Sequence, residues 1–188
     1  MADLLTQAEE RIGQPLDVTF RNAARDLTRT TEELTALLLA AWQSGQMTDT
    51  EFRDSLHSLL VTGYASGLMV GDAIGSGYVN AAPVGLGIDQ RTTDRLGQAA
   101  ATTTTLLDAA EDPLPRLRRL TVAEHLDSLQ QGVVGAYNAH GVRGYTRGLS
   151  ANACQLCQWL YKGGYVYPSH QPMHQHPGCT CVPIPATK

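Results

Sequence analysis

The residues best suited to chemistry lie near the C-terminus, where all four cysteines fall between positions 154 and 181. Cys154 and Cys157 are separated by two residues, so a tight turn brings both sulfur atoms to the same side. The motif His176-Pro-Gly-Cys179-Thr-Cys181 follows later in the chain. Paired thiolates and a second ligand group can complete the tetrahedral shell that structural zinc prefers. The sequence therefore predicts a structural Zn²⁺ site with five candidate ligands, Cys154, Cys157, His176, Cys179 and Cys181.

Four of these five residues would fill the shell, and the sequence leaves the choice open. Cys154 and Cys157 have the most favourable spacing. Cys179 and Cys181 point to alternate sides of an extended chain, so one of them could pack beside the ion while His176 binds it. His170 and His174 are lesser candidates, for which a surface position is the alternative.

Chemistry at this metal is not expected. A catalytic zinc keeps an open position for water and an acidic or histidine base close to it. From Ser128 onward the chain contains no Asp or Glu. The sequence therefore predicts a protein that is not an enzyme, with no catalytic residue and no small-molecule substrate.

Two disulfides are the alternative use of the four cysteines. Asp3, Glu9 and Glu10 stand where a secretory signal would carry Lys or Arg. We therefore expect synthesis in a reducing cytoplasm, where cysteines clustered beside histidines favour a metal site. No apolar run reaches the roughly 18 residues of a membrane span, so no membrane partner is expected.

Charge is divided unevenly along the chain. All 18 acidic side chains precede Ser128, and the remainder carries four Lys and Arg, namely Arg143, Arg147, Lys162 and Lys188. This asymmetry favours an acidic partner, either nucleic acid or an acidic protein surface. Four basic residues are fewer than a surface that binds nucleic acid usually carries.

Helical patterns dominate the rest of the chain and must position the cysteines. A first helix is expected over residues 16–42, with its apolar face at Leu27, Leu34, Leu37, Leu38 and Ala41. A capping box at Thr48 and Glu51 opens the second helix. Further helices are predicted over residues 89–110 and from a second capping box at Thr121 to His140.

The second helix carries glycines at every fourth position. Gly63, Gly67 and Gly71 line one helical face and predict close backbone approach to another helix. Glycine and proline then predict a linker over residues 75–88.

The predicted organisation has four parts. They are an N-terminal helical region (1–74), a Gly/Pro linker (75–88), a second helical region (89–140) and a Cys/His zinc-knuckle module (141–188). A short strand is expected over residues 144–149. Trp159, Tyr161, Tyr165 and Tyr167 are expected to form a small core around the metal. The fold class is mainly α, an extended helical part with a small C-terminal zinc-stapled α+β knuckle.

The order of motifs in the last third of the chain resembles a known family. A Tyr/Asn/Ala segment at Tyr137 precedes a short strand, Cys-x-x-Cys, a glycine with an aromatic residue, and His-Pro-x-Cys-x-Cys with a following proline. This order is similar to the C-terminal module of the phage Mu F-like minor head proteins, over about residues 130–185. The chain has Ser150–Ala153 where the family has an acid before the first cysteine, and Thr180 where it has Arg. Neither difference changes a candidate ligand.

The resemblance implies a minor capsid protein of a tailed bacteriophage, made in the host cytoplasm and located in the virion. Such a protein would dock onto the major capsid protein, the portal protein or both during head assembly, and could contact packaged DNA. A zinc-ribbon-type DNA-binding protein is the first alternative, although it would show more Lys and Arg. An HNH-like nuclease is the second, although acids are missing around His174-Gln-His176.

Overall fold

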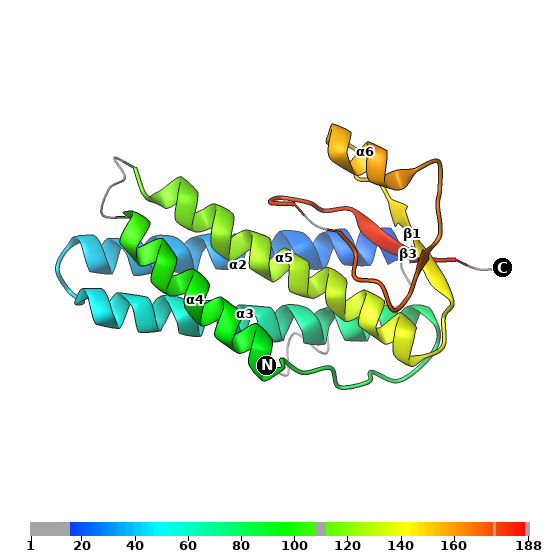
Figure 1. Ribbon diagram of the computed structural model, residues 1–188, viewed down its shortest axis with the longest axis horizontal. Helices are drawn as coiled ribbons and strands as arrows, with labels where there is room; N and C mark the ends of the chain where they lie inside the picture. The colour runs from blue at the N-terminus through cyan, green and yellow to red at the C-terminus, as the bar shows by residue number, and fades with distance from the viewer. Residues whose placement is uncertain (1–15, 108–111, 175, 187–188) are drawn as a thin grey trace.

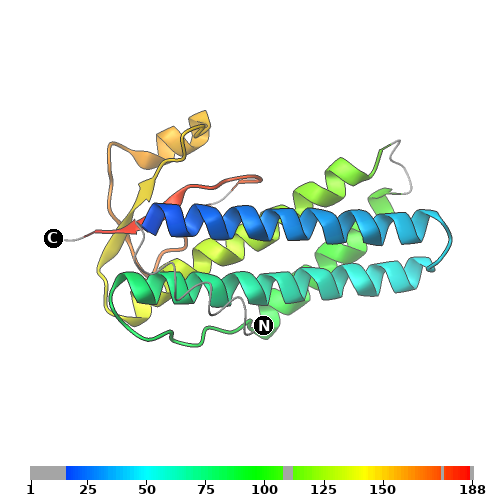
Figure 2. The same ribbon diagram turned by 180° about the vertical axis from the view of Figure 1, so that it is seen from behind.

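The computed structural model describes residues 16–107, 112–174 and 176–186. Within them, long helices form the body of the molecule: α2 (Leu16–Gln43), α3 (Asp49–Tyr78), α4 (Gln90–Leu107) and α5 (Leu114–Ala139). A small module follows, made of β1 (Gly144–Gly148), α6 (Gln155–Tyr161), β2 (Tyr167–Pro168) and β3 (Val182–Pro185). It lies at one end of the helical bundle (Figure 1; Figure 2). The predicted fold class, mainly helical with a small C-terminal α+β part that carries the cysteines, is confirmed.

Helices α2 and α3 run side by side in opposite directions, joined by a short turn (Figure 2). Thr48 caps α3 as the sequence predicts. The Glu51 amide donates to the Thr48 hydroxyl oxygen at 3.3 Å, and the Thr48 amide donates to the Glu51 carboxylate at 2.8 Å. These bonds satisfy amides that a helix start leaves without partners. Trp42 stacks on Phe52 across the turn, with ring centroids 4.7 Å apart.

Glycines allow α3 and α5 to pack at very short range. A Cβ atom added at Gly71 would lie 2.1 Å from the carbonyl oxygen of Leu129. Gly67 and Gly75 meet α5 in the same way, and Gly132 of α5 faces back onto the backbone of α3. The close approach predicted from the glycine spacing is confirmed.

The buried face of α2 matches the predicted apolar face only in part, because Leu27 and Leu38 pack against the core. Leu34 and Leu37 are exposed, whereas Thr31 and Thr35 are buried. Thr31 Oγ1 lies 2.5 Å from Nδ1 of His125 on α5, and the Thr35 hydroxyl bonds a second α5 side chain at 2.9 Å. Buried hydroxyls are tolerated here because each has a hydrogen-bond partner. The predicted face is therefore wrong at Leu34 and Leu37, where threonines are buried instead.

The predicted linker over residues 75–88 begins later than expected, because α3 continues to Tyr78. The loop after α3 is held by Asp72, whose carboxylate accepts bonds from the amides of residues 84–86 at 2.7 to 3.2 Å. Burial raises the pKa of this carboxyl, but the amides and Ser76 outweigh burial and bring the pKa below its usual value. The charge of Asp72 thus ties the loop to α3.

Helix α5 begins earlier than predicted. Pro113 is its N-cap and Pro115 lies in its first turn, where a missing amide breaks no helical hydrogen bond. Thr121 lies inside the helix, where its hydroxyl donates to the carbonyl of Leu117 at 3.1 Å. The capping box predicted at Thr121 is therefore wrong, and the prolines mark the start of the helix.

The module shares its hydrophobic core with the bundle. Its sheet has the order β2-β1-β3 and both pairings are antiparallel. Buried side chains of α2 and α5 pack with those of the module, among them Phe20, Val133, Tyr137, Tyr145, Met173 and Val182. The Tyr137 hydroxyl also donates to the carbonyl of Pro183 at 3.2 Å. The bundle therefore fixes where the module sits.

None of the helices described combines the length and the hydropathy that a membrane crossing requires. Parts of the predicted regions lie outside the described residues, namely residues 1–15, 108–111, 175 and 187–188. They include the predicted end of the third helix at Ala110.

Candidate metal centre

Two short segments bring the five predicted ligands together. Cys154 is the N-cap of α6, and the buried Cys157 lies in the first turn of that helix. The other three candidates lie between β2 and β3. There the amide of Cys179 donates to the carbonyl of His176 at 3.1 Å, and Gly178 takes a φ of 77°, which favours glycine. A helix start and a tight turn therefore face each other across the site.

The ligand atoms form two overlapping groups of three, which share the sulfur of Cys157. Nε2 of His176 lies 3.2 Å from Sγ of Cys154 and 2.9 Å from Sγ of Cys157. The sulfurs of Cys157 and Cys179 are 3.6 Å apart. Two groups have their ligand atoms within 4.8 Å of one another, Cys154–Cys157–His176 and Cys157–Cys179–Cys181. An ion about 2.3 Å from each sulfur separates its ligand atoms by about 3.8 Å. Cys157 belongs to both groups.

Each candidate ligand has a definite place. The sulfurs of Cys179 and Cys181 both lie near the sulfur of Cys157. The expectation that one of these two cysteines could point away from the cluster is therefore wrong. Among the described residues, His170 and His174 belong to neither group and are exposed.

The ring of His176 is oriented by the backbone of the next residue. Nδ1 lies 3.1 Å from the carbonyl oxygen of Pro177. A proton on Nδ1 would be donated to that oxygen, which leaves the lone pair of Nε2 facing the two sulfurs. Metal-binding histidines are commonly fixed by such a bond from the second nitrogen.

A buried arginine lies against the sulfurs, and the sequence analysis missed it. Arg147 of β1 is 2% exposed, and its Nη1 lies 3.7 Å from Cys157 Sγ and 3.6 Å from Cys179 Sγ. Its Nη2 donates to the carbonyl of His174. A buried guanidinium needs negative partners, and the sulfurs of Cys157 and Cys179 would supply them as metal-bound thiolates. One feature of the sequence could have indicated this role of Arg147, because the predicted strand contains no other charged residue.

The three buried thiols perturb one another. The hydrogen bond to Cys181, together with burial, raises the pKa of Cys179, and burial raises the pKa of Cys157. The bond from the Cys179 thiol lowers the pKa of Cys181, to which Arg147 also donates. Cys181 is therefore the group most ready to exist as thiolate, the form that binds metal.

Helix α5 holds the backbone of the second ligand segment. The buried side-chain amide of Gln130 donates to the carbonyl of Cys181 at 2.7 Å and to that of Cys179 at 3.3 Å. Gln130 was not identified from the sequence, because its partners lie far away along the chain. This contact fixes the cysteine segment relative to the bundle.

The aromatic core predicted around the metal is wrong. Trp159, Tyr161 and Tyr165 are exposed, and only Tyr167 is half-buried. The bundle end supplies the apolar cover instead, so the module does not need these rings inside it.

Carboxylates from α5 approach the His176 side of the cluster, although the module's own segment has none. Glu124 and Asp127 line a small pocket of about 180 Å³ with His176. The Glu124 carboxylate accepts two bonds from Arg95, each 2.7 Å long, and Asp127 accepts one from Gln131. Both acids thus have partners on the helices, and neither belongs to a ligand group.

Replacing Arg147 by Met is expected to weaken metal binding by about tenfold or more, because the negative charge of the thiolates would lose its buried counter-charge. The measurement is competition with a chromophoric chelator. Arg143→Met is the matched control, because Arg143 is exposed and its loss should leave the affinity unchanged. Equal affinities for both variants would contradict the role of Arg147.

No protein-family model, curated protein or solved structure matches this chain. The structure by itself shows a Cys/His cluster that could hold a metal ion, located at the end of a helical bundle.

Proposed function

We propose that the cluster holds one structural Zn²⁺ ion and that the chain is a minor structural protein of a tailed-phage head. The observation that carries this proposal is that Cys154, Cys157, His176, Cys179 and Cys181 form two ligand groups that share Cys157. These are the residues on which the resemblance to the Mu F-like minor head proteins rests.

The donor set favours zinc over other metals. Thiolate and imidazole ligands at tetrahedral spacing suit Zn²⁺, whereas Mg²⁺ and Ca²⁺ prefer oxygen ligands. Three thiolates and a neutral histidine around Zn²⁺ leave about −1 on the cluster, and four thiolates leave about −2. The adjacent Arg147 would neutralise the first arrangement completely, which favours three cysteines and His176.

The proposed role of the ion is to fix shape. It would join the start of α6 to the segment between β2 and β3, and thus close a module too small to be rigid by burial alone. Gln130 and Tyr137 bond that segment to α5. The result would be a rigid element held at one end of the bundle, suited to docking on the major capsid protein or the portal protein.

The two alternatives have less support. A zinc-ribbon-type DNA-binding protein would need a basic track, whereas the exposed basic side chains of the described module are Arg143 and Lys162. An HNH-like nuclease would need free acids at a catalytic metal. The nearest ones at the cluster, Glu124 and Asp127, are engaged by Arg95 and Gln131.

The test is mass spectrometry of phage particles, purified by density gradient from cells whose genome encodes this chain. The expected result is that peptides of the chain co-purify with full heads at a small fraction of the major capsid protein. Particles that lack the chain, while it accumulates in the soluble lysate, would overturn the proposal. Binding of duplex DNA at physiological salt by the free chain would favour the DNA-binding alternative.

A further inference from the structure

Large apolar side chains stand exposed on α6 and on the loop that follows it. Trp159 is 65% exposed and Tyr165 is 50% exposed, and Leu156, Tyr161 and Val166 are also exposed. These five residues form what we call the α6 patch. Soluble proteins rarely leave such a group uncovered unless it is an interaction site. Trp and Tyr are also the residues that most often anchor protein interfaces.

Contacts with the rest of the module support the backbone of α6 and one ring of the patch. Cys157 anchors the inner side of α6 in the metal cluster, while Leu156 and Trp159 share another side of the helix. The Tyr167 hydroxyl donates to the carbonyl of Leu160, and the ring of Tyr165 packs edge-on against that of Tyr167 at 4.9 Å. A backbone and a ring supported in this way lose less entropy when a partner binds.

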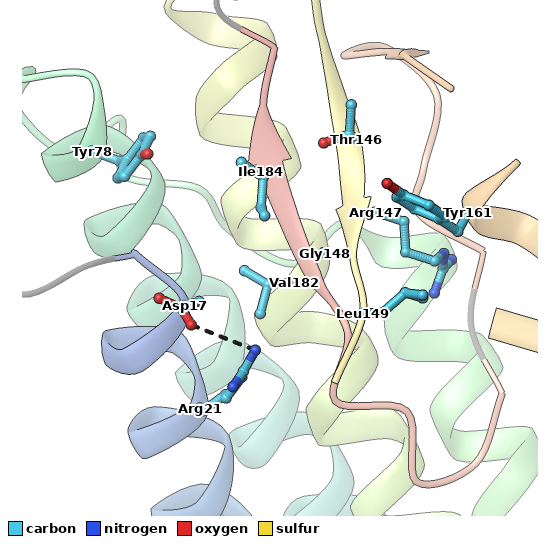
Figure 3. A pocket seen from close by; sticks show the side chains of 10 residues that line it. All are labelled: Asp17, Arg21, Tyr78, Thr146, Arg147, Gly148, Leu149, Tyr161, Val182 and Ile184. Atoms are coloured by element: carbon cyan, nitrogen blue, oxygen red, sulfur yellow. Dashed lines mark ion pairs between the residues drawn. The ribbon is translucent and has the colours of Figure 1, made fainter. Parts of the chain in front are cut away.

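A groove lies beside the patch, between the module and the ends of α2 and α3. Figure 3 shows Tyr161 at one side of it and Tyr78 at the other, with Val182 and Ile184 of β3 between them. Its volume is about 590 Å³, and the exposed ion pair between Asp17 and Arg21 at 3.5 Å closes one edge. The groove offers room for apolar side chains of a partner next to the exposed ring of Tyr161.

The charged side chains around the α6 patch favour an acidic partner. The Lys162 ammonium lies 5.3 Å from the ring centre of Tyr165 and 6.0 Å from that of Tyr167. No Asp or Glu occurs from Ser128 onward. An acidic partner therefore meets the Lys162 ammonium and no acid of the module, and Asp17 at the groove edge is paired with Arg21. Single-stranded nucleic acid would need a continuous basic track beside the rings, and one exposed lysine does not make one.

We propose that the α6 patch and its groove dock an acidic protein segment that presents apolar side chains. The inference rests on the proposed docking role and names the surface that performs it. Trp159 and Leu156 would be the anchors, and Lys162 would pair with a carboxylate of the partner.

The test uses the full, metal-loaded chain and a synthetic amphipathic peptide with leucines on one helical face and glutamates on the other. In a Trp42→Phe variant the emission reports Trp159 alone, since the chain has two tryptophans. We expect the emission to shift to shorter wavelength as the peptide binds. Anisotropy of labelled peptide should show binding weakened about tenfold or more by Trp159→Ser. Binding of a peptide with lysines in place of the glutamates should be weaker by a similar factor.

Leu37→Ser is the matched control, because Leu37 on α2 is 68% exposed and should not change the affinity. Equal losses in the Leu37 and Trp159 variants would overturn the proposal, as would equal affinity for the two peptides. Tighter binding of an oligothymidylate, or self-association of the chain that Trp159→Ser abolishes, would also overturn it. Binding of the acidic peptide by a chain that is absent from phage particles would support the surface and reject only the head-protein role.

Discussion

Replacing Cys157 by Ser is expected to abolish metal binding and to unfold the module of residues 144–186, while α2 to α5 stay helical. The Cys157 sulfur lies within ligand distance of His176 and Cys179 and belongs to both ligand groups, so its loss leaves neither complete. Structural zinc contributes about 10 kcal/mol to the folding of isolated zinc modules. We expect a loss of about 5 kcal/mol here, because the bundle also supports the module. Limited proteolysis with mass spectrometry would locate the new cleavage sites.

Two comparisons make the Cys157 result specific. Thr180→Ser changes a residue between two ligands without removing a sulfur, and it should resist proteolysis as the wild type does. A strong chelator should make the wild type as sensitive as the Cys157 variant and should have no further effect on that variant. A module that stays protected in both chelator and the Cys157 variant would mean that no metal stabilises it.

Replacing Gly71 by Ala is expected to destabilise the bundle by about 3 kcal/mol. The added Cβ would lie 2.1 Å from the Leu129 carbonyl oxygen and 2.9 Å from Cα of Gly132, both backbone atoms that cannot rotate away. α3 and α5 would have to separate, and this would outweigh the gain of about 1 kcal/mol in helix propensity. Urea unfolding followed by circular dichroism measures the change.

Gly97→Ala is the matched control for that substitution. Gly97 also lies within a helix, but its Cβ would meet only the flexible side chain of His57, at 3.3 Å. Its effect should be small or stabilising. Equal stability of the Gly71 and Gly97 variants would show that α3 and α5 do not pack through the glycines.

The Cys/His cluster could be predicted from the sequence because its candidate ligands lie in two local motifs. Spacing alone identified Cys154, Cys157 and the His176–Cys181 segment. The residues around them could not be found in this way. Arg147 and Gln130 reach the cluster from β1 and α5, and such contacts depend on the tertiary fold.

Errors in the fold prediction have a common physical origin. Apolar spacing placed Leu37 inside, but the α2–α5 contact buries Thr31 and Thr35, whose hydroxyls find hydrogen-bond partners there. Aromatic composition likewise placed Trp159 in a local core, but side chains of the bundle fill that space. The glycine spacing of α3 was a sound guide, because only a residue without a side chain permits such close contact.

The central claim is that the cluster holds one metal ion, and elemental mass spectrometry of the purified full chain tests it most directly. The account predicts about one zinc per chain, unchanged in Thr180→Ser and absent in Cys157→Ser. A wild-type chain without bound metal after purification in zinc-supplemented, chelator-free buffer would contradict it.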